Sequence, residues 1–142
     1  MMIKYYDVYK PVFDRVKEDI EALSATIKSV VLAEQFRVTD LPMAVINPDP
    51  TDINQAVMGT TLDNQVNMSV VLLIRETEPT NWFTDIVSVM GDVVDAILAD
   101  RTLNGKATDI FPTLFAPGEV RTSGKLYYGG LVKFRATMFF TP

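Results

Sequence analysis

Cysteine and histidine are both absent from this sequence of 142 residues. Their absence excludes disulfides, zinc sites built from thiolates or imidazoles, and every catalytic arrangement in which histidine activates a serine or a cysteine. The sequence also contains neither a GxGxxG motif nor a P-loop, two common motifs that bind nucleotide phosphates. We therefore expect a protein that is not an enzyme and that uses no cofactor and no metal ion.

Long hydrophobic runs and an excess of basic charge are missing as well. The longest aliphatic run, Val70 to Ile74, is far shorter than the ~20 residues that a membrane-spanning helix needs. The opening residues, MMIKYYDVYKP, contain no apolar stretch of the kind found in secretory signals. With 13 basic and 18 acidic residues, the net charge is −5, which does not attract nucleic acid or anionic lipid. We expect no membrane partner and no specific binding of DNA.

A large apolar fraction, 48% of the residues, is present within a length typical of one domain. We therefore treat residues 1–142 as a single domain with a substantial core. Because this fraction lies near the top of the globular range, it favours some contact between subunits.

Two amphipathic helices are predicted from apolar residues that recur at every third or fourth position. The first pattern extends from Pro11 to Ile27, and its proline suits a first helical turn. The second extends from about Asn81 to Asp100, with Thr80 or Asn81 as the N-cap. After it, Asn104-Gly105 allows the positive φ angles of a chain reversal.

The segment between the two helices predicts two to four strands. Ser29 to Val38 fits either an extension of the first helix or a strand, and its β-branched residues favour the strand. Pro42 to Asn47 is predicted as a short strand, followed by an exposed loop at a Pro-Asp-Pro sequence. Residues 53–64 indicate a short edge strand and then a turn at Asp63-Asn64. Gln65 to Glu76 is the clearest central strand, because apolar residues occupy both of its faces.

Two further strands are predicted after the second helix. Ala107 to Phe115 is expected to be a strand, and Ala116 to Lys125 a loop, because the latter contains Pro-Gly and Ser-Gly pairs. Leu126 to Phe140 alternates in the pattern of a strand with one buried and one mostly wet face. Within it, Gly129-Gly130 predicts a bulge or a close backbone approach rather than a phosphate site. The fold class is therefore α+β, with a mainly antiparallel sheet of four to five strands and two helices packed on one face.

Two pairs of carboxylates are the remaining candidates for chemistry, Asp49 with Asp52 and Asp92 with Asp95. Carboxylate oxygens bind magnesium and calcium, but neither pair has the spacing of an EF-hand loop. We interpret both pairs as surface charge.

Three tyrosines near the start of the chain, Tyr5, Tyr6 and Tyr9, raise the question of a platform on which bases stack. Such a platform normally lies among basic residues, which are sparse here, and the net charge is acidic. We interpret the three tyrosines as residues for packing or for subunit contact.

The second half of the chain carries a family resemblance. The predicted helix IVSVMGDVVDAILADRTLNG, then a short strand, a loop and the closing strand LVKFRATMFF resemble the tail terminator and tail-completion proteins of long-tailed viruses. The turn formed by Asp100, Thr102, Leu103 and Gly105 is similar to the turn that commonly ends the second helix in that family. The first helix and the strand Pro42 to Ile46 fit the same plan.

The resemblance implies a structural virion protein that assembles into a hexameric ring at the head-proximal end of the tail tube. Such a ring ends tube polymerisation and joins the tail to the head connector or neck protein. It is assembled in the host cytoplasm and lets DNA pass without binding it specifically. Three alternatives stay open: another neck or tail-tube protein, a non-viral ligand-binding or regulatory α/β module, and an enzyme that uses carboxylates alone.

Charge offers a mechanism for the passage of DNA through such a ring. Six copies of a chain with net charge −5 carry −30 in total, and acidic groups that face the bore repel phosphates. Our hypothesis is that some of four acidic residues in predicted loops line the bore: Asp49, Asp52, Asp63 and Glu119. The competing interpretation is ordinary solvated loop charge.

Overall fold

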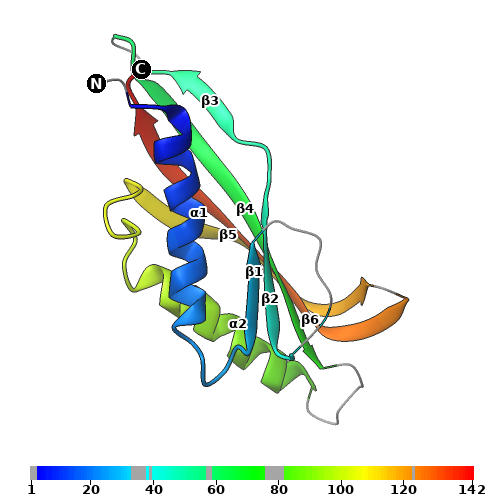
Figure 1. Cartoon of the computed structure of the whole chain (residues 1–142). Coiled ribbons are helices and arrows are strands. Elements are labelled where there is room, and N and C mark those ends of the chain that lie inside the picture. The colour runs from blue at the N-terminus through cyan, green and yellow to red at the C-terminus, as the bar shows by residue number, and fades with distance from the viewer. Residues whose placement is uncertain (1–2, 33–37, 39, 57–58, 76–81, 123) are drawn as a thin grey trace.

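The computed structural model describes residues 3–32, 38, 40–56, 59–75, 82–122 and 124–142. It contains two helices and six strands (Figure 1). Their order along the chain is α1 (Tyr5–Glu21), β1 (Ser29–Leu32), β2 (Met43–Pro48), β3 (Asp52–Gln55), β4 (Leu62–Arg75), α2 (Trp82–Leu98), β5 (Asp109–Thr122) and β6 (Lys125–Phe140).

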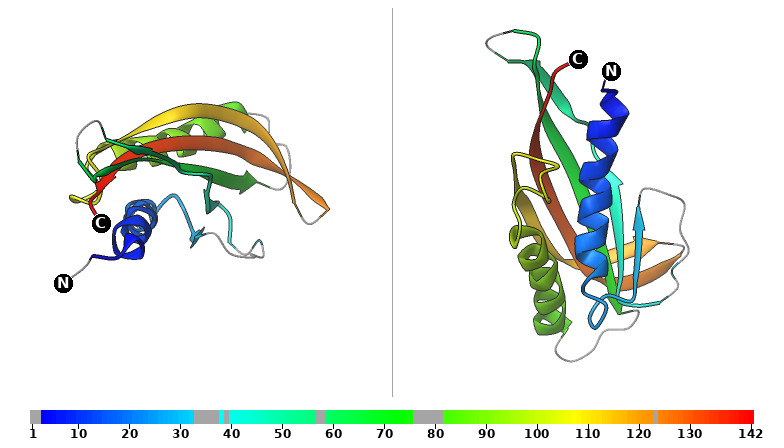
Figure 2. Two further views of the ribbon diagram at one scale, coloured as in Figure 1. Left: turned by 90° about the horizontal axis from the view of Figure 1, so that it is seen from above. Right: turned by 60° about the vertical axis from the view of Figure 1, so that its left-hand side comes forward.

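The six strands form one sheet in the order β1-β2-β4-β6-β5, and β3 pairs with β4 beyond the end of β2. All pairs are antiparallel except β1 with β2. The sheet is strongly twisted, and its longest strands run along α1 and α2 (Figure 2). The predicted α+β class is confirmed; the sheet has one strand more than the largest number expected.

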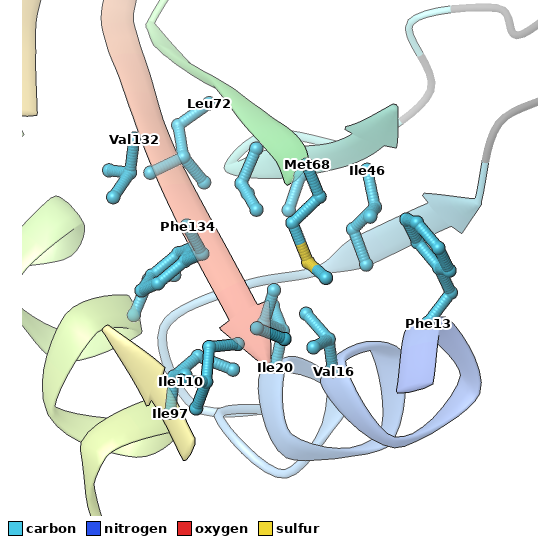
Figure 3. Packing of buried hydrophobic residues seen from close by; sticks show 14 of the residues in the cluster. Phe13, Val16, Ile20, Ile46, Met68, Leu72, Ile97, Ile110, Val132 and Phe134 are labelled. Atoms are coloured by element: carbon cyan, nitrogen blue, oxygen red, sulfur yellow. The ribbon is translucent and has the colours of Figure 1, made fainter. Parts of the chain in front are cut away.

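Both helices bury their apolar stripes on the same face of the sheet, which we call the helix face. Val16 and Ile20 of α1 and Ile97 of α2 converge on Phe134 of β6 and Ile110 of β5 (Figure 3). These residues belong to one buried cluster that also includes alternate residues of β2 and β4. Full burial of each such side chain stabilises the fold by about 1.5–3 kcal/mol, so the shared core fixes both helices to the sheet.

The first helix begins at Tyr5, six positions before the predicted start at Pro11, and ends at Glu21 rather than near Ile27. Its added turns are held by ring contacts, because Tyr5 stacks on Tyr9 with centroids 5.7 Å apart. The Tyr5 ring also meets Phe140 of β6 edge-on, with centroids 5.4 Å apart, and this tertiary contact helps to offset the cost of a proline inside the helix. Ile27 is still buried, but it lies in the turn that leads to β1.

Between the helices, the strands at Ser29–Leu32 and Met43–Pro48 are confirmed, and so is a short edge strand, β3. The predicted turn at Asp63-Asn64 is wrong, because both residues lie inside β4. The chain reverses earlier, where Gly59 has φ +86° and the Ala56 N–H donates to the Thr61 carbonyl at 2.9 Å. The predicted cap at Thr80 or Asn81 lies outside the described residues.

The loop predicted from Ala116 to Lys125 is also wrong, because β5 continues to Thr122 and forms a long hairpin with β6. Prolines occur in β5 because an outermost strand pairs on only one side and tolerates a missing N–H. The predicted close approach at Gly129-Gly130 is confirmed: a Cβ on Gly129 would lie 1.8 Å from the Leu72 carbonyl oxygen. After α2, Asn104 and Gly105 have the predicted positive φ angles, +55° and +81°.

Candidate assembly surfaces

The described residues contain no group of three or more acidic side chains placed to hold a metal ion. No helix among them is long and apolar enough to span a membrane.

Three of the four predicted bore residues lie on the same face of the sheet, the one opposite the helices, which we call the open face. Asp49 accepts a hydrogen bond from the Ser69 hydroxyl, and Asp63 accepts one from Gln65 Nε2 at 2.9 Å. Asp52 stands opposite Gln65 in the β3–β4 pairing, so its side chain shares that face. We call Asp49, Asp52 and Asp63 the acidic group.

Glu119 is not brought into the acidic group. It lies on β5 opposite Tyr128, whose side chain packs in the core on the helix face. Tyr128 pairs with Arg75 at the far end of β4 from Asp63, roughly 40 Å away at ~3.3 Å per residue. Of the four acids only Asp49 lies in a connection between strands, so the predicted loop position is wrong for the other three. Whether any of them faces a bore stays a prediction.

Polar side chains continue the open face from the acidic group onto β6. Arg135 Nε donates to Asn67 Oδ1 at 3.0 Å, and the Thr137 hydroxyl donates to Gln65 Oε1 at 3.2 Å. These cross-strand pairs fix long side chains against the sheet. The open face therefore carries acidic groups on β3 and β4 beside a basic group on β6.

The other end of the open face is apolar. Met43, Val45, Leu73 and Tyr127 form a second, smaller buried cluster there. Val120 of the β5–β6 hairpin packs against it from the edge of the sheet. This end of the sheet is consequently buried on both faces, whereas the end where β3 pairs with β4 is buried only on the helix face.

Large apolar side chains are exposed at the margins of the subunit rather than at its centre. They are Ile3, Tyr6, Ile53, Phe83, Leu114, Phe115 and Phe139. Single exposed apolar residues are normal in monomers. Most of them lie on edge strands or near helix starts, however, which makes them candidates for contact with other subunits.

A groove of about 680 Å³ lies between α1 and β1. Tyr6, Tyr9 and Phe13 line it from the helix, and Val30 and Leu32 line it from the strand. Charged side chains of the helix flank this apolar floor, among them Lys10, Asp14 and Lys17. The Asp14 carboxylate accepts a hydrogen bond from Lys10 Nζ at 2.9 Å, and this bond raises the pKa of the lysine.

The sequence was compared with models of known protein families and with curated proteins. It matches none of them.

The junction between α1 and the end of α2 contains a polar group that sequence reasoning missed. Burial raises the pKa of Asp19, and the nearby carboxylates of Asp100 and Glu18 add to that effect. Arg15 opposes it, with Nε 3.1 Å from Asp19 Oδ1. Hydrogen bonds from Thr102 lower the pKa of Asp100 itself. The Arg15–Asp19 pair lies within α1 and the bonds of Asp100 lie within the turn after α2, so the two sets interact only through charge.

Sequence reasoning also missed the groove and the exposed outer strand β5. The groove is formed by segments that are separated along the chain, so no single stretch of sequence marks it. The interpretation of Tyr6 and Tyr9 as packing or contact residues was the available signal, since both line the groove.

Proposed function

We propose that the protein is a structural virion protein of a long-tailed virus, of the tail terminator or tail-completion type. Its copies form a hexameric ring at the head-proximal end of the tail tube and end tube polymerisation. The ring then contacts the tail tube protein on one side and the head connector or neck protein on the other. DNA passes through it without specific binding.

The observation that carries this proposal is the pair of unlike sheet edges on one subunit. One edge is β1, beside the apolar groove, and the other is β5, with Leu114 and Phe115 exposed. Two different edges on opposite sides of a subunit suit a head-to-tail contact, which generates a ring when the rotation closes. The sequence resemblance of Phe83 to Phe140 supplies the family, and the absence of histidine and cysteine agrees with a structural role.

We further propose that the acidic group faces the bore. Its three carboxylates lie on the open face, the face that carries no helix, and extend along β4 from Asp63 to Ser69, the partner of Asp49. In a ring, this placement repeats the same negative charge around the lumen, where it repels the phosphates of passing DNA. Lys133 and Arg135 of β6 stand opposite Ser69 and Asn67, beside Asp49, so the repulsion is strongest at Asp52 and Asp63, where β3 pairs with β4.

Removing the gene from a virus that encodes this chain tests the proposal. Electron microscopy of the resulting particles should show overlong tails or tails that are not attached to heads. Restoring the gene on a plasmid should return normal particles, which controls for effects on neighbouring genes. Normal particles without the protein would refute the assignment.

The groove favours a second candidate, a ligand-binding or regulatory module. Its volume of about 680 Å³ lies within the range of small-molecule sites, and its floor is largely apolar. This candidate predicts a monomer or dimer that is stabilised by a small apolar ligand. A screen by thermal shift, combined with light scattering to determine the oligomeric state, separates it from the ring.

A further inference from the structure

We infer that the groove between α1 and β1 receives strand β5 of a neighbouring copy, with Phe115 inserted between the helix and the strand. The inference rests on the proposed ring and names the two surfaces that form its subunit contact. The occupant is a second copy of this chain, and the argument depends on direction, spacing and charge.

The groove is open along the free edge of β1. This strand pairs with β2 on one side, and no strand in the described part of the chain pairs with it on the other. Val30 and Leu32 point to the helix face, because their partners Ala44 and Ile46 belong to the main core. A strand added beside β1 would therefore direct alternate side chains into the space beneath α1.

Strand β5 presents the matching side chains at the opposite edge of the subunit. Phe115 stands opposite the core residue Val132, so it projects toward the helix face, yet 41% of its surface is exposed. Glu119 stands opposite Tyr128 on the same face. No ion pair of Glu119 is found among the described residues, so its charge is available to a neighbour.

The directions of the elements allow these surfaces to meet. Following the pairings across the sheet, β5 is antiparallel to β1. A copy that continues the sheet with the same strand directions thus places its β5 antiparallel to β1. Since α1 also runs opposite to β1 (Figure 1), the incoming strand and α1 run in the same sense.

The spacings then agree along the groove. Phe115 and Glu119 are four residues apart on a strand, about 13 Å. Tyr9 and Lys17 are eight residues apart on α1, about 12 Å. When Phe115 lies beside Tyr9, Glu119 therefore reaches Lys17, which has no ion pair of its own among the described residues.

Two prolines restrict how far backbone pairing can contribute to this contact. Pro112 and Pro117 of β5 lack an N–H, so the outer edge of that strand cannot form an uninterrupted ladder. Side chains must then supply most of the specificity. A contact of this type suits a ring of fixed size better than a sheet that extends without limit.

Adjacent residues of β5 offer a matched test. Phe115 and Leu114 are almost equally exposed, 41% and 42%, but they lie on opposite faces of the strand. Phe115→Ser should weaken self-association about thirtyfold, the effect of losing a central aromatic anchor. Leu114→Ser should leave it within about threefold of the wild type. Sedimentation velocity over a wide concentration range measures both, and equal effects of the two changes would overturn the inference.

Charge reversal tests the register of the contact. Glu119→Lys and Lys17→Glu should each weaken association by about threefold, and the double variant should recover the wild-type value. Asp95→Lys and Lys106→Glu change exposed charges elsewhere and should have no effect. Circular dichroism confirms that each variant is folded. A double variant as weak as the single ones would overturn the proposed register.

The outcome for this contact is separable from the outcome for the proposed function. If deletion of the gene gives overlong tails but Phe115→Ser associates normally, the contact is wrong and the function stands. If Phe115→Ser dissociates the oligomer but deletion leaves particles normal, the contact stands and the function is wrong. Wild-type protein that remains monomeric at several hundred micromolar would overturn the contact, whatever the particles show.

Discussion

Replacing Tyr5 by phenylalanine removes the hydrogen bond that ties the start of α1 to the sheet. The Tyr5 hydroxyl donates to Asn64 Oδ1 at 2.7 Å, and Asn64 is completely buried. Burial, followed by the effect of Tyr9, raises the pKa of Tyr5, so the phenol remains a donor at neutral and mildly alkaline pH. The Asn64 amide group keeps its bonds to the carbonyls of Leu62 and Met138. Only its oxygen loses its partner.

A buried acceptor without a donor costs about 1–3 kcal/mol, and we expect Tyr5→Phe to lower the free energy of unfolding by that amount. The ring contacts of Tyr5 with Tyr9 and Phe140 do not involve the hydroxyl, so packing should be unchanged. Urea unfolding monitored by circular dichroism gives the difference. At roughly 4 °C per kcal/mol for a chain of this size, the melting temperature should fall in parallel.

Tyr6→Phe is the matched control, because Tyr6 lies next in the chain and is 65% exposed. We expect it to change stability by less than about 0.5 kcal/mol. Hydrogen exchange adds a local measurement, since loss of the bond should speed exchange in the first turns of α1. If Tyr5→Phe and Tyr6→Phe have the same stability, the reasoning about the buried amide is refuted.

Three further predictions concern the sheet, the helix junction and the acidic group. Gly129→Ala should destabilise the fold by about 3 kcal/mol or more, because the added Cβ meets main-chain atoms of β4. Gly91 of α2 has open space around it, so Gly91→Ala should be neutral or stabilising by up to about 1 kcal/mol in the same unfolding assay. The raised pKa of Asp19 means that the folded state holds its proton more tightly than the unfolded state, so this residue costs stability as pH rises through its folded pKa. Asp19→Asn should therefore gain stability relative to the wild type over that rise in pH. An unfolding series across acidic pH in which the two proteins do not diverge would contradict the assignment. Changing all three residues of the acidic group to asparagine should increase retention of duplex DNA at low salt in a gel-shift assay, whereas Asp92→Asn with Asp95→Asn on α2 should not; equal retention would remove the argument for a repulsive bore.

The elements that sequence predicted well have strong, regular patterns. The apolar stripe of α2 and the alternation of β6 extend over many residues, and burial on one face enforces both. The close backbone approach at the glycine pair in β6 was also predicted, because a glycine inside a strand often marks such an approach.

The errors arose where local chemistry pointed one way and the sheet required another. Asp63-Asn64 has the composition of a turn, but in β4 Asn64 uses its polar side chain to satisfy buried carbonyls. Pro117-Gly118 likewise indicated a loop, although β5 accommodates proline at its open side. In both segments, strand pairing with residues distant in sequence outweighs the turn preference of the local residues.

The candidate surfaces were less predictable than the fold. The acidic group forms because β2, β3 and β4 are neighbours, and Glu119 separates from it because β5 lies at the far edge. Neither the grouping of the three aspartates nor the separation of Glu119 can be predicted from their spacing along the sequence. The groove depends similarly on the angle between α1 and β1, which only packing against the shared core determines.

The paired strands β4 and β6 have a mechanical consequence. They stay in register over almost their whole length and connect the acidic group at one end with the β5–β6 hairpin at the other. A load applied at the Leu62 end is therefore carried by continuous pairing as far as Leu73, and the register shift between Leu73 and Arg75 is the place where the two strands can bend.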